Sequence, residues 1–282
     1  MKKYFCIDLG GTKTIVALFN ENGEQLFHVK FPTLSEKGVD FWFERLMSLS
    51  KVCIENNNIE MGCIASPGPL DIKSGKIVNI PTMGWKDVSI VKMLEDAFGF
   101  KFKLINDCSA GALGAWSVVK PNNMLYVSVS TGIGGGLVLN SRLYEGNGNA
   151  AEIGHISVNG KGIKCACGRT DCLELYASGS GIQKLYKKET KKNLSAEELS
   201  ILAGKGDELA KTLFLNAGTL INKVLKNVDT LLDLDEIIIG GGLTNSKELF
   251  WKNLSKDIPK CKLCSLNGDQ VLIGAFIYIK EY

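Results

Sequence analysis

One histidine and three cysteines lie at spacings typical of a structural zinc site. His155 precedes Cys165 by ten positions, and Cys167 and Cys172 follow within the next seven. Three thiolates and one imidazole form a closed tetrahedral ligand set for Zn²⁺. The segment between them is rich in glycine and lysine and poor in apolar residues, so it needs a bound ion to order it. We therefore expect zinc here rather than three scattered reduced thiols.

Two glutamates flank this segment. Glu152 precedes His155 by three residues, and Glu174 follows Cys172 by two. A metal that fixes the loop would also fix these carboxylates as acceptors for a ligand rich in hydroxyl groups. Surface glutamates with no ligand fit the spacing equally well, so both interpretations stay open.

An aspartate stands where α/β enzymes present side chains at the ends of strands. Asp107 follows an apolar strand predicted over 102–105 and precedes a helix predicted over 109–116. A carboxylate in this position could act as general base toward an alcohol. The alternative is an N-cap for the helix, which is the preferred interpretation for this residue taken alone. Asn106 beside it could hydrogen-bond a polyol.

Two glycine-rich turns could hold phosphate groups. Asp8–Lys13 and Ser130–Gly136 each place glycines and a threonine between two apolar strands. Glycine lets the backbone approach an anion closely, and the N–H groups of a turn can surround phosphate oxygens. Neither turn is a Walker A loop or a dinucleotide fingerprint. A lone turn of this kind is more often an ordinary hairpin, but two in matching positions, with Gly240–Gly242 after another strand, indicate a nucleotide held between two domains.

The elements that position these residues form a weak internal repeat. Residues 5–20 and 125–140 each read as an apolar strand, a glycine and threonine turn, a second apolar strand and an asparagine turn, 120 positions apart. The pattern predicts an α/β protein with a first domain over 1–119 and a larger second domain over 120–268. We expect a closing helix over about 269–282 that packs back on the first domain. Further elements are expected as helices at 39–57, 87–98, 177–192, 195–203, 207–227 and 245–255, strands at 61–65 and 236–239, and an irregular stretch at 146–174.

Composition narrows the classes of function. The 282 residues carry 33 basic and 30 acidic side chains, a net charge of +3, which argues against nucleic acid or an anionic membrane as the main partner. Nine cysteines are an odd number in a chain of this size, so a disulfide framework is not expected. The apolar run after Lys2 and Lys3 stops at Asp8, and no stretch approaches the ~18 apolar residues of a membrane helix. We expect a cytoplasmic, reduced protein.

The motifs together resemble those of the ROK family (repressors, open reading frames and kinases), in particular its bacterial glucokinases and N-acetylmannosamine kinases. The likeness runs nearly end to end. The segments that carry it are Asp8–Lys13, Ser66–Asp71, Asn106–Asp107, Ser130–Gly136, Ala151–His155, Cys165–Glu174, Gly240–Gly242 and Leu272–Ala275.

This resemblance implies two ribonuclease-H-like domains of the actin and hexokinase type, with ATP and a sugar in the cleft between them. Asp107 would be the base that activates the sugar 6-hydroxyl, and Asp8 would sit near Mg²⁺. His155 would bind both sugar and zinc. The other implied sugar contacts are Gly68, Asn79, Asn106, Glu152 and Glu174. The implied ATP contacts are Gly10, Gly11, Thr12, Lys13, Thr131, Gly132 and Gly134 at the phosphates, and Gly241 and Gly242 near the adenosine.

Departures from the family pattern bear on the sugar. Ser109 replaces a common asparagine, and Pro81–Trp85 is one residue shorter than the usual segment, with Asn79 as a substitute for its asparagine. We expect glucose as the substrate, with N-acetylmannosamine or another N-acetylhexosamine as the alternative. Two other classes of function compete with a kinase. A sugar-sensing repressor is not expected, because there is no room for a DNA-binding domain before Tyr4. A catalytically inactive binding module stabilised by zinc is not expected either, because Asp107 is present. The family resemblance also implies a homodimer.

Overall fold

The computed structural model describes residues 2–55, 57–158, 161–266 and 268–282. The chain divides into two compact units. The first comprises Met1–Val119, Leu143–Ala150 and Asp269–Tyr282, and the second comprises Lys120–Arg142 and Ala151–Gly268. The segment Leu143–Ala150, which the sequence placed in the second domain, thus belongs to the first unit.

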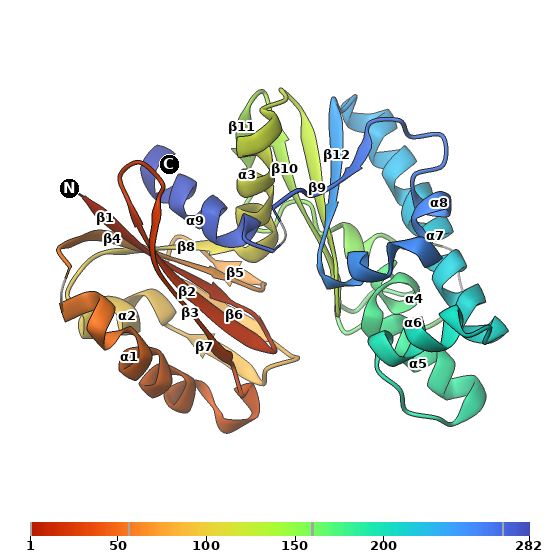
Figure 1. The fold of residues 1–282 in the computed structure, drawn as a ribbon, viewed down its shortest axis with the longest axis horizontal. Helices are drawn as coiled ribbons and strands as arrows, with labels where there is room; N and C mark the ends of the chain where they lie inside the picture. Colours follow the sequence, from red (N-terminus) through yellow and green to blue (C-terminus); the bar gives the residue numbers. More distant parts are fainter. Residues whose placement is uncertain (1, 56, 159–160, 267) are drawn as a thin grey trace. The chain divides into compact units, whose positions relative to one another are not determined.

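A five-stranded sheet forms the centre of the first unit (Figure 1). Its order is β3-β2-β1-β4-β8, in which β1 to β3 are antiparallel and β4 and β8 run parallel to β1. The central strands β1 and β4 are nearly continuous apolar runs because helices cover both faces of the sheet. The strands are β1 (Lys3–Leu9), β2 (Lys13–Asn20), β3 (Gln25–Pro32), β4 (Ile59–Ser66) and β8 (Phe102–Asn106).

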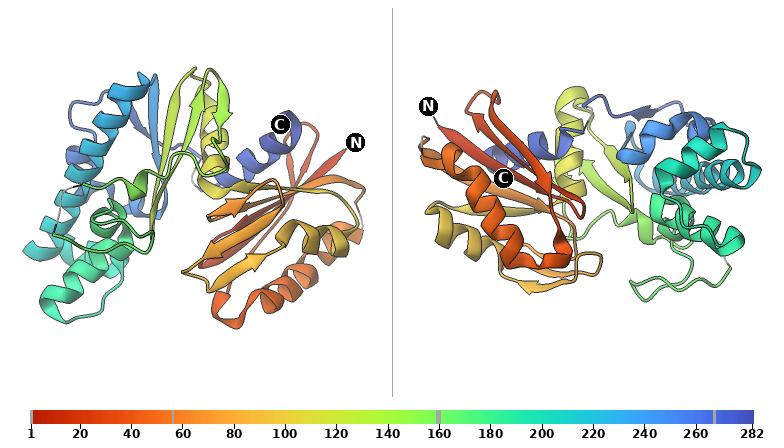
Figure 2. Two further views of the ribbon diagram at one scale, coloured as in Figure 1. Left: turned by 180° about the vertical axis from the view of Figure 1, so that it is seen from behind. Right: turned by 60° about the horizontal axis from the view of Figure 1, so that its bottom comes forward.

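Helices α1 (Val39–Glu55) and α2 (Ile90–Phe98) pack on one face of this sheet, where Trp42 and Leu94 are fully buried. Helices α3 (Asp107–Val119) and α9 (Gln270–Glu281) pack against each other, and α9 also covers β1 and β4. A Cβ on Gly274 would lie 1.7 Å from the carbonyl oxygen of Ala110, so only glycine permits this close approach. Figure 2 shows these helices from two further sides.

A small second sheet in this unit was not predicted. Its order is β5-β6-β7, formed by β5 (Leu70–Asp71), β6 (Lys76–Ile80) and β7 (Trp85–Val88). The helix expected to begin at residue 87 begins at Ile90 instead, because Asp87 has a φ of 52°, outside the helical region. The helix expected over 39–57 ends at Glu55, and residue 56 lies outside the described part of the chain.

The second unit repeats the sheet of the first. Its order is β11-β10-β9-β12-β13, again with an antiparallel first hairpin and with β12 and β13 parallel to β9. The repeat expected from residues 5–20 and 125–140 is thereby confirmed. The strands are β9 (Met124–Val129), β10 (Ile133–Leu139), β11 (Arg142–Tyr144), β12 (Glu236–Gly240) and β13 (Cys261–Leu263). The last two residues of β11 belong to the segment Leu143–Ala150, which is counted with the first unit.

The long helix α7 (Glu208–Leu232) supplies much of the second core. Phe214, Ile221 and Leu225 recur at helical spacing and are fully buried, so one face of the helix packs into the core. The helix expected over 245–255 is instead a 3₁₀ segment followed by a short helix. The remaining helical elements are η1 (Ser35–Lys37) in the first unit and η2 (Ile153–His155), α4 (Glu174–Ala177), α5 (Gly179–Thr190), α6 (Ala196–Gly204), η3 (Gly242–Leu249) and α8 (Trp251–Leu254) in the second.

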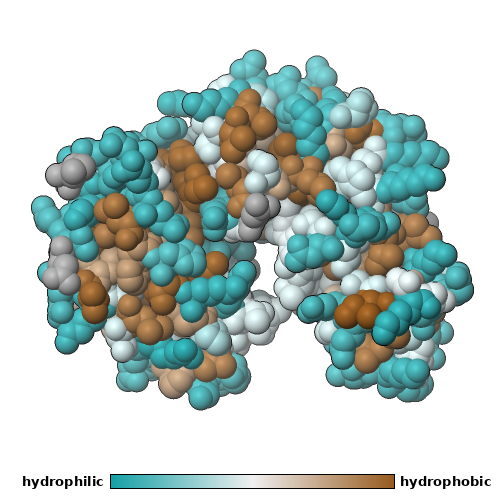
Figure 3. Space-filling model, viewed as in Figure 1, coloured by the Kyte–Doolittle hydropathy of each residue, from teal (hydrophilic) through white to brown (hydrophobic). Residues whose placement is uncertain are grey.

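The stretch expected to be irregular, 146–174, contains η2 and otherwise only turns and isolated bridges; residues 159–160 lie outside the description. Within the described chain, no helix is both long and apolar enough to cross a membrane. The face drawn in Figure 3 mixes polar and apolar residues on both units. All nine cysteines lie among the described residues and are free thiols in this structure.

Candidate active site

The carboxyl ends of β1, β4 and β8 bring the polar residues of the first unit to one edge of its sheet. Asp8 lies opposite Ala65 of β4, and Ser66 at the end of that strand lies opposite Asn106 of β8. Asp8, the Ser66–Gly68 turn and Asp107 therefore lie at the carboxyl ends of three neighbouring parallel strands. This edge is where open α/β sheets bind their ligands.

Asn106 caps helix α3. Its Oδ1 accepts hydrogen bonds from the backbone N–H of Cys108 at 2.9 Å and of Ser109 at 3.1 Å, the pattern of an N-cap. Asp107 occupies the first helical position, and its Oδ1 accepts from the Cys108 N–H at 2.8 Å. The capping role considered for Asp107 belongs chiefly to Asn106, which leaves the second carboxylate oxygen of Asp107 for other chemistry.

The two carboxylates of this edge influence each other. Burial raises the pKa of Asp107 above its ordinary value, against the effect of the hydrogen bonds from Cys108. Burial, and then the charge of Asp107, raise the pKa of Asp8 to about 7, while nearby Lys13 acts in the opposite direction. A cation or a proton at Asp8 would relieve this repulsion.

Hydrogen bonds stabilise the turn between β1 and β2, and the tip of this turn is exposed. The N–H of Gly10 donates to the carbonyl of Lys13 at 3.0 Å, and a Cβ on Gly10 would lie 2.8 Å from that oxygen. Thr33 Oγ1 donates to the carbonyl of Gly10 at 2.6 Å, and its N–H donates to the carbonyl of Thr12 at 3.0 Å. Gly11 and Thr12 are exposed at the tip, so their backbone N–H groups are accessible to an anion.

The second unit has its own pair of glycine turns at one sheet edge. Ser130–Gly132 follows β9, and Gly241 and Gly242 follow its parallel neighbour β12. Gly241 has a φ of 92°, and a Cβ there would lie 2.4 Å from the carbonyl oxygen of Val129, so the position requires glycine. A Cβ on Gly242 would lie 3.6 Å from Ser130 Oγ. The turns predicted to contact phosphate and adenosine are thus adjacent.

Gly134 lies in strand β10 and not in the turn that the sequence predicted. The turn after β9 is shorter than expected, because β10 begins at Ile133 and Gly134 pairs with Ser128 in the strand ladder. Thr131 and Gly132 remain in the turn. The carbonyls of Ser130 and Thr131 accept the N–H groups of Gly179 at 2.8 Å and Ser180 at 3.1 Å, which fix the turn on the start of α5.

His155, Cys165, Cys167 and Cys172 converge. One ligand atom from each lies within 4.8 Å of the others. The Sγ atoms of Cys167 and Cys172 are 3.5 Å apart, and Cys165 Sγ is 3.7 Å from His155 Nδ1. Sulfur atoms bound to one tetrahedral zinc ion are separated by about 3.8 Å, given a Zn–S bond of ~2.3 Å. The four side chains have the chemistry and the spacing of a zinc site.

The loop that carries the thiols is shaped by its own hydrogen bonds. The N–H of Gly168 donates to the carbonyl of Cys165 at 3.0 Å, and the N–H of Cys165 donates to the carbonyl of Arg169 at 2.9 Å. Asp171 accepts from the N–H groups of Gly162 at 3.1 Å and Ile163 at 2.8 Å, and from the Tyr176 hydroxyl at 2.5 Å. Burial raises the pKa of the Cys172 thiol to about 12, so a metal is needed to bind it as thiolate.

Glu174 joins the thiol cluster to the glycine turn. Its Oε1 lies 3.5 Å from His155 Nδ1 and 3.4 Å from Cys165 Sγ, and its Oε2 lies 3.5 Å from where a Cβ on Gly132 would be. Glu152 is exposed just before η2, and its carbonyl accepts the N–H of His155 at 3.0 Å. Glu174, His155 and the thiols are therefore brought together as the flanking positions suggested, and Glu152 is linked to them through η2.

The two remaining predicted sugar contacts are Asn79 and Gly68. Asn79 lies in β6 of the small sheet, and its role as a sugar contact stays a prediction. Gly68 lies beside Asn106 and also beside Asn149, which the sequence did not single out. Asn149 stands in a run of alternating glycine and asparagine, Gly146–Asn149, in which nothing distinguishes it from Asn147.

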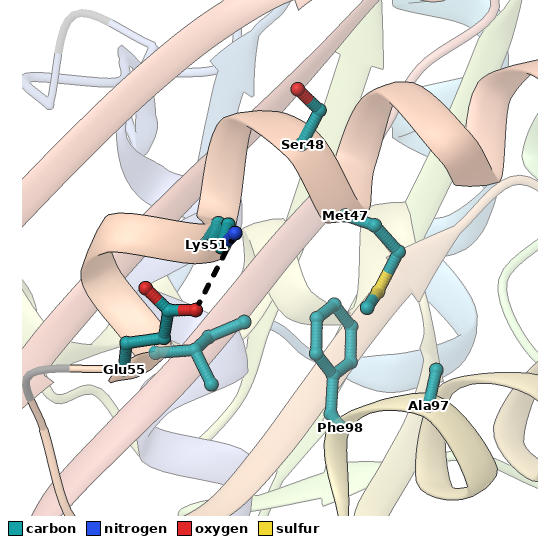
Figure 4. A pocket seen from close by; sticks show the side chains of 7 residues that line it. Met47, Ser48, Lys51, Glu55, Ala97 and Phe98 are labelled. Atoms are coloured by element: carbon teal, nitrogen blue, oxygen red, sulfur yellow. Dashed lines mark ion pairs between the residues drawn. The ribbon is translucent and has the colours of Figure 1, made fainter.

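A pocket elsewhere in the first unit lacks the polar groups of the candidate active site. It has a volume of about 340 Å³ and lies between α1 and α2 (Figure 4). Its lining is mainly apolar, with Met47 and Phe98 facing each other and an ion pair of 3.7 Å between Lys51 and Glu55 at its side. None of the predicted site residues lines it.

Comparison with known proteins gives consistent matches along nearly the whole chain. A family model described as the ROK family matches residues 4–274. The chain is 31% identical over 276 residues to an N-acetyl-D-glucosamine kinase of Haemophilus influenzae (strain 86-028NP), covering 91% of this chain and 89% of the relative. It is 27% identical to a glucokinase of Halalkalibacterium halodurans, covering 99% and 95%. A solved ROK family glucokinase from Streptomyces griseus, in complex with glucose and AMPPNP, shares the fold with a TM-score of 0.81, 24% identity and 97% coverage of both chains.

Proposed function

Because the chain belongs to the ROK family, we propose that it is an ATP-dependent sugar kinase that transfers the γ-phosphate of ATP to the 6-hydroxyl of a hexose. The observation that carries the proposal is Asp107, a partly buried carboxylate at the carboxyl edge of the sheet, beside Asn106 and electrostatically coupled to Asp8. Relatives at 31% and 27% identity carry the names of sugar kinases, although others at about 30% carry the name xylose repressor, and a protein of the same fold binds glucose and a non-hydrolysable ATP analogue.

Asp107 acts as general base in this proposal. Its raised pKa makes it a stronger proton acceptor than an ordinary aspartate, and the Cys108 N–H fixes one of its oxygens. The other oxygen takes the proton of the 6-hydroxyl as the sugar oxygen attacks the γ-phosphate in line. The amide Nδ2 of Asn106 is left to hold a neighbouring hydroxyl, since its Oδ1 caps α3.

The glycine turns are the proposed phosphate and nucleoside contacts. The accessible N–H groups of Gly11 and Thr12, with the N–H of half-buried Gly132, would stabilise charge on phosphoryl oxygens, and Gly241 and Gly242 would let the adenosine approach the backbone. Asp8 would face Mg²⁺, directly or through water. The ion supplies charge neutralisation of the phosphates when it is bound.

We propose structural zinc at His155, Cys165, Cys167 and Cys172. The donor set and the convergence of the four side chains fit the ion. Its role would be to fix His155 and Glu174 relative to each other, so that the imidazole and the carboxylate are presented to sugar hydroxyls in one orientation.

The proposed sugar is glucose, with an N-acetylhexosamine as the alternative. Both names occur among similar proteins, at 27% and 31% identity. We further propose that the protein is cytoplasmic, since reduced thiols at the proposed metal site suit a reducing compartment. We also propose that it forms a homodimer, as the family resemblance implies. Sedimentation velocity would give the oligomeric state.

A panel of sugars tests the proposed function. ATP consumption and sugar phosphate would be measured with glucose, N-acetylmannosamine, N-acetylglucosamine, mannose, fructose and allose. We expect stoichiometric ADP and hexose 6-phosphate with at least one of them, and the highest kcat/KM with glucose. Binding of sugar without ATP turnover would favour the regulator or binding-module classes instead.

A further inference from the structure

The loop Leu143–Ala150 is held on the first unit by its own contacts. The N–H of Leu143 donates to the Tyr282 hydroxyl at 2.7 Å, and the Tyr278 hydroxyl donates to Glu145 Oε1 at 3.0 Å. The loop then turns back on itself, because the carbonyl of Glu145 accepts the N–H groups of Gly148 at 2.8 Å and Ala150 at 3.2 Å. Tyr278 of α9 and Tyr282, which follows this helix, thus fix the loop, and the last turn of the loop presents Asn149.

Asn149 lies beside the residues proposed to hold the sugar. Its Oδ1 accepts the backbone N–H of Leu70 at 3.4 Å. A Cβ on Gly68 would lie 3.5 Å from this Oδ1 and 3.6 Å from Asn106 Nδ2. Two carboxamides therefore border the space that a side chain at position 68 would fill, and glycine leaves that space to a ligand.

The contact with Leu70 fixes the direction of the Asn149 amide. Because Oδ1 is the acceptor, the Nδ2 group is the end that remains for donation, and it has no protein acceptor among the described residues. Asn149 is exposed, so its Nδ2 can reach a ligand. Asn106 also has its Oδ1 bound to backbone N–H groups, but its Nδ2 faces the space at Gly68, whereas it is the Oδ1 of Asn149 that borders this space.

We propose that Asn149 is a sugar-binding residue that helps to select the substrate, an inference that rests on the proposed kinase function. Asp107 is next to Asn106 in the chain, Asn106 Nδ2 and Asn149 Oδ1 border the same space at Gly68, and Asp107 lies at the proposed reacting 6-hydroxyl. The pyranose ring carries its C2 and C3 substituents on the side remote from C6. Asn149 Nδ2 donates to an oxygen of one of these substituents, where a hexose and an N-acetylhexosamine differ.

The variant Asn149→Asp separates sugar binding from support of the loop. Aspartate keeps an oxygen for the Leu70 N–H but has no Nδ2 donor. We expect the KM for the best sugar to rise about tenfold, the loss typical of one hydrogen bond, with KM for ATP unchanged. The same variant should be within about twofold of wild type on the 2-deoxy or 3-deoxy analogue that lacks the accepted oxygen. Asn147→Asp, an exposed change of the same kind in the same loop, is the control and should leave all constants unchanged.

Each outcome decides the inference. A wild-type sugar KM in Asn149→Asp would overturn it, as would an equal rise in Asn147→Asp or an equal loss on both deoxy analogues. Failure of the proposed function would appear differently, as a wild-type protein that phosphorylates no hexose. In that case titration calorimetry of the sugar against the wild type and Asn149→Asp would still test the contact, with a tenfold weaker Kd expected for the variant and an equal Kd overturning it.

Discussion

At the scale of single residues, two adjacent side chains at the end of β8 divide two tasks. Asn106 caps α3 through its Oδ1, and in the proposed kinase its amide N–H₂ would bind the sugar while Asp107 would supply the carboxylate. The sequence predicted both residues as site residues but favoured Asp107 as the cap. The sequence could not show which of the two residues caps the helix, because a carboxamide oxygen and a carboxylate oxygen can both accept a hydrogen bond from an N–H group of the first turn.

Substitutions of Asn106 should separate the cap from the ligand contact. Asn106→Ala loses both, so we expect a free energy of unfolding lower by about 0.5–2 kcal/mol and a higher KM for the sugar. Asn106→Asp keeps a capping oxygen and should retain stability while it loses the donor. Urea unfolding and sugar kinetics on both variants check this, and a normal sugar KM in either variant would remove Asn106 from the sugar site.

Asp8 should make stability depend on pH in the absence of Mg²⁺ and nucleotide. Its pKa is raised from 3.8 to about 7, so the folded state binds this proton more tightly than the unfolded chain. The resulting stabilisation is fully present below about pH 4 and is lost as the pH rises through 7, by on the order of 2–4 kcal/mol. Asp8→Asn removes this contribution.

Thermal unfolding of wild type and Asp8→Asn between pH 5 and pH 9 checks the shift. The difference between the two proteins isolates Asp8 from other groups that titrate in this range. We expect the wild type to lose stability relative to the variant as the pH rises. Parallel curves over the whole range would contradict a raised pKa at Asp8.

At the scale of elements, the duplicated hairpin was predictable and the small sheet was not. β1–β2 and β9–β10 are long apolar runs around glycine turns, which local pattern identifies. β5, β6 and β7 are two to five residues long, too short for an alternating pattern to stand out. Tertiary packing on the core of the first unit, through Leu70, Ile77 and Trp85, stabilises them.

The loop that carries the proposed zinc ligands should depend on a bound ion. Freshly purified, reduced protein should contain one zinc per chain by elemental analysis, and Cys167→Ala or Cys172→Ala should abolish it. We expect these variants to have a lower Tm and a higher KM for the sugar, because His155 and Glu174 lose their fixed placement. Cys264→Ala, outside the cluster, is the matched control and should retain zinc. A wild-type protein with no stoichiometric metal would contradict the assignment.

At the scale of the whole molecule, the two units share one sheet topology, and each carries a set of predicted site residues at the carboxyl edge of its parallel strands. The sequence predicted the repeat and most of these residues, because the glycines, an aspartate and the candidate zinc ligands have distinctive local patterns. It did not predict that Leu143–Ala150 returns to the first unit. That placement depends on Tyr278 and Tyr282, which are more than 130 positions away in the chain.

The most direct test of the proposed kinase function is the formation of hexose 6-phosphate from ATP by wild type and Asp107→Asn, followed by ³¹P NMR. The account predicts product with the wild type and a kcat reduced by about 10²–10⁴-fold in the variant, the contribution of a general base. Sugar binding, zinc content and Tm should stay close to those of the wild type. Phosphorylation by Asp107→Asn at nearly the wild-type rate would contradict the role of Asp107 and the mechanism built on it.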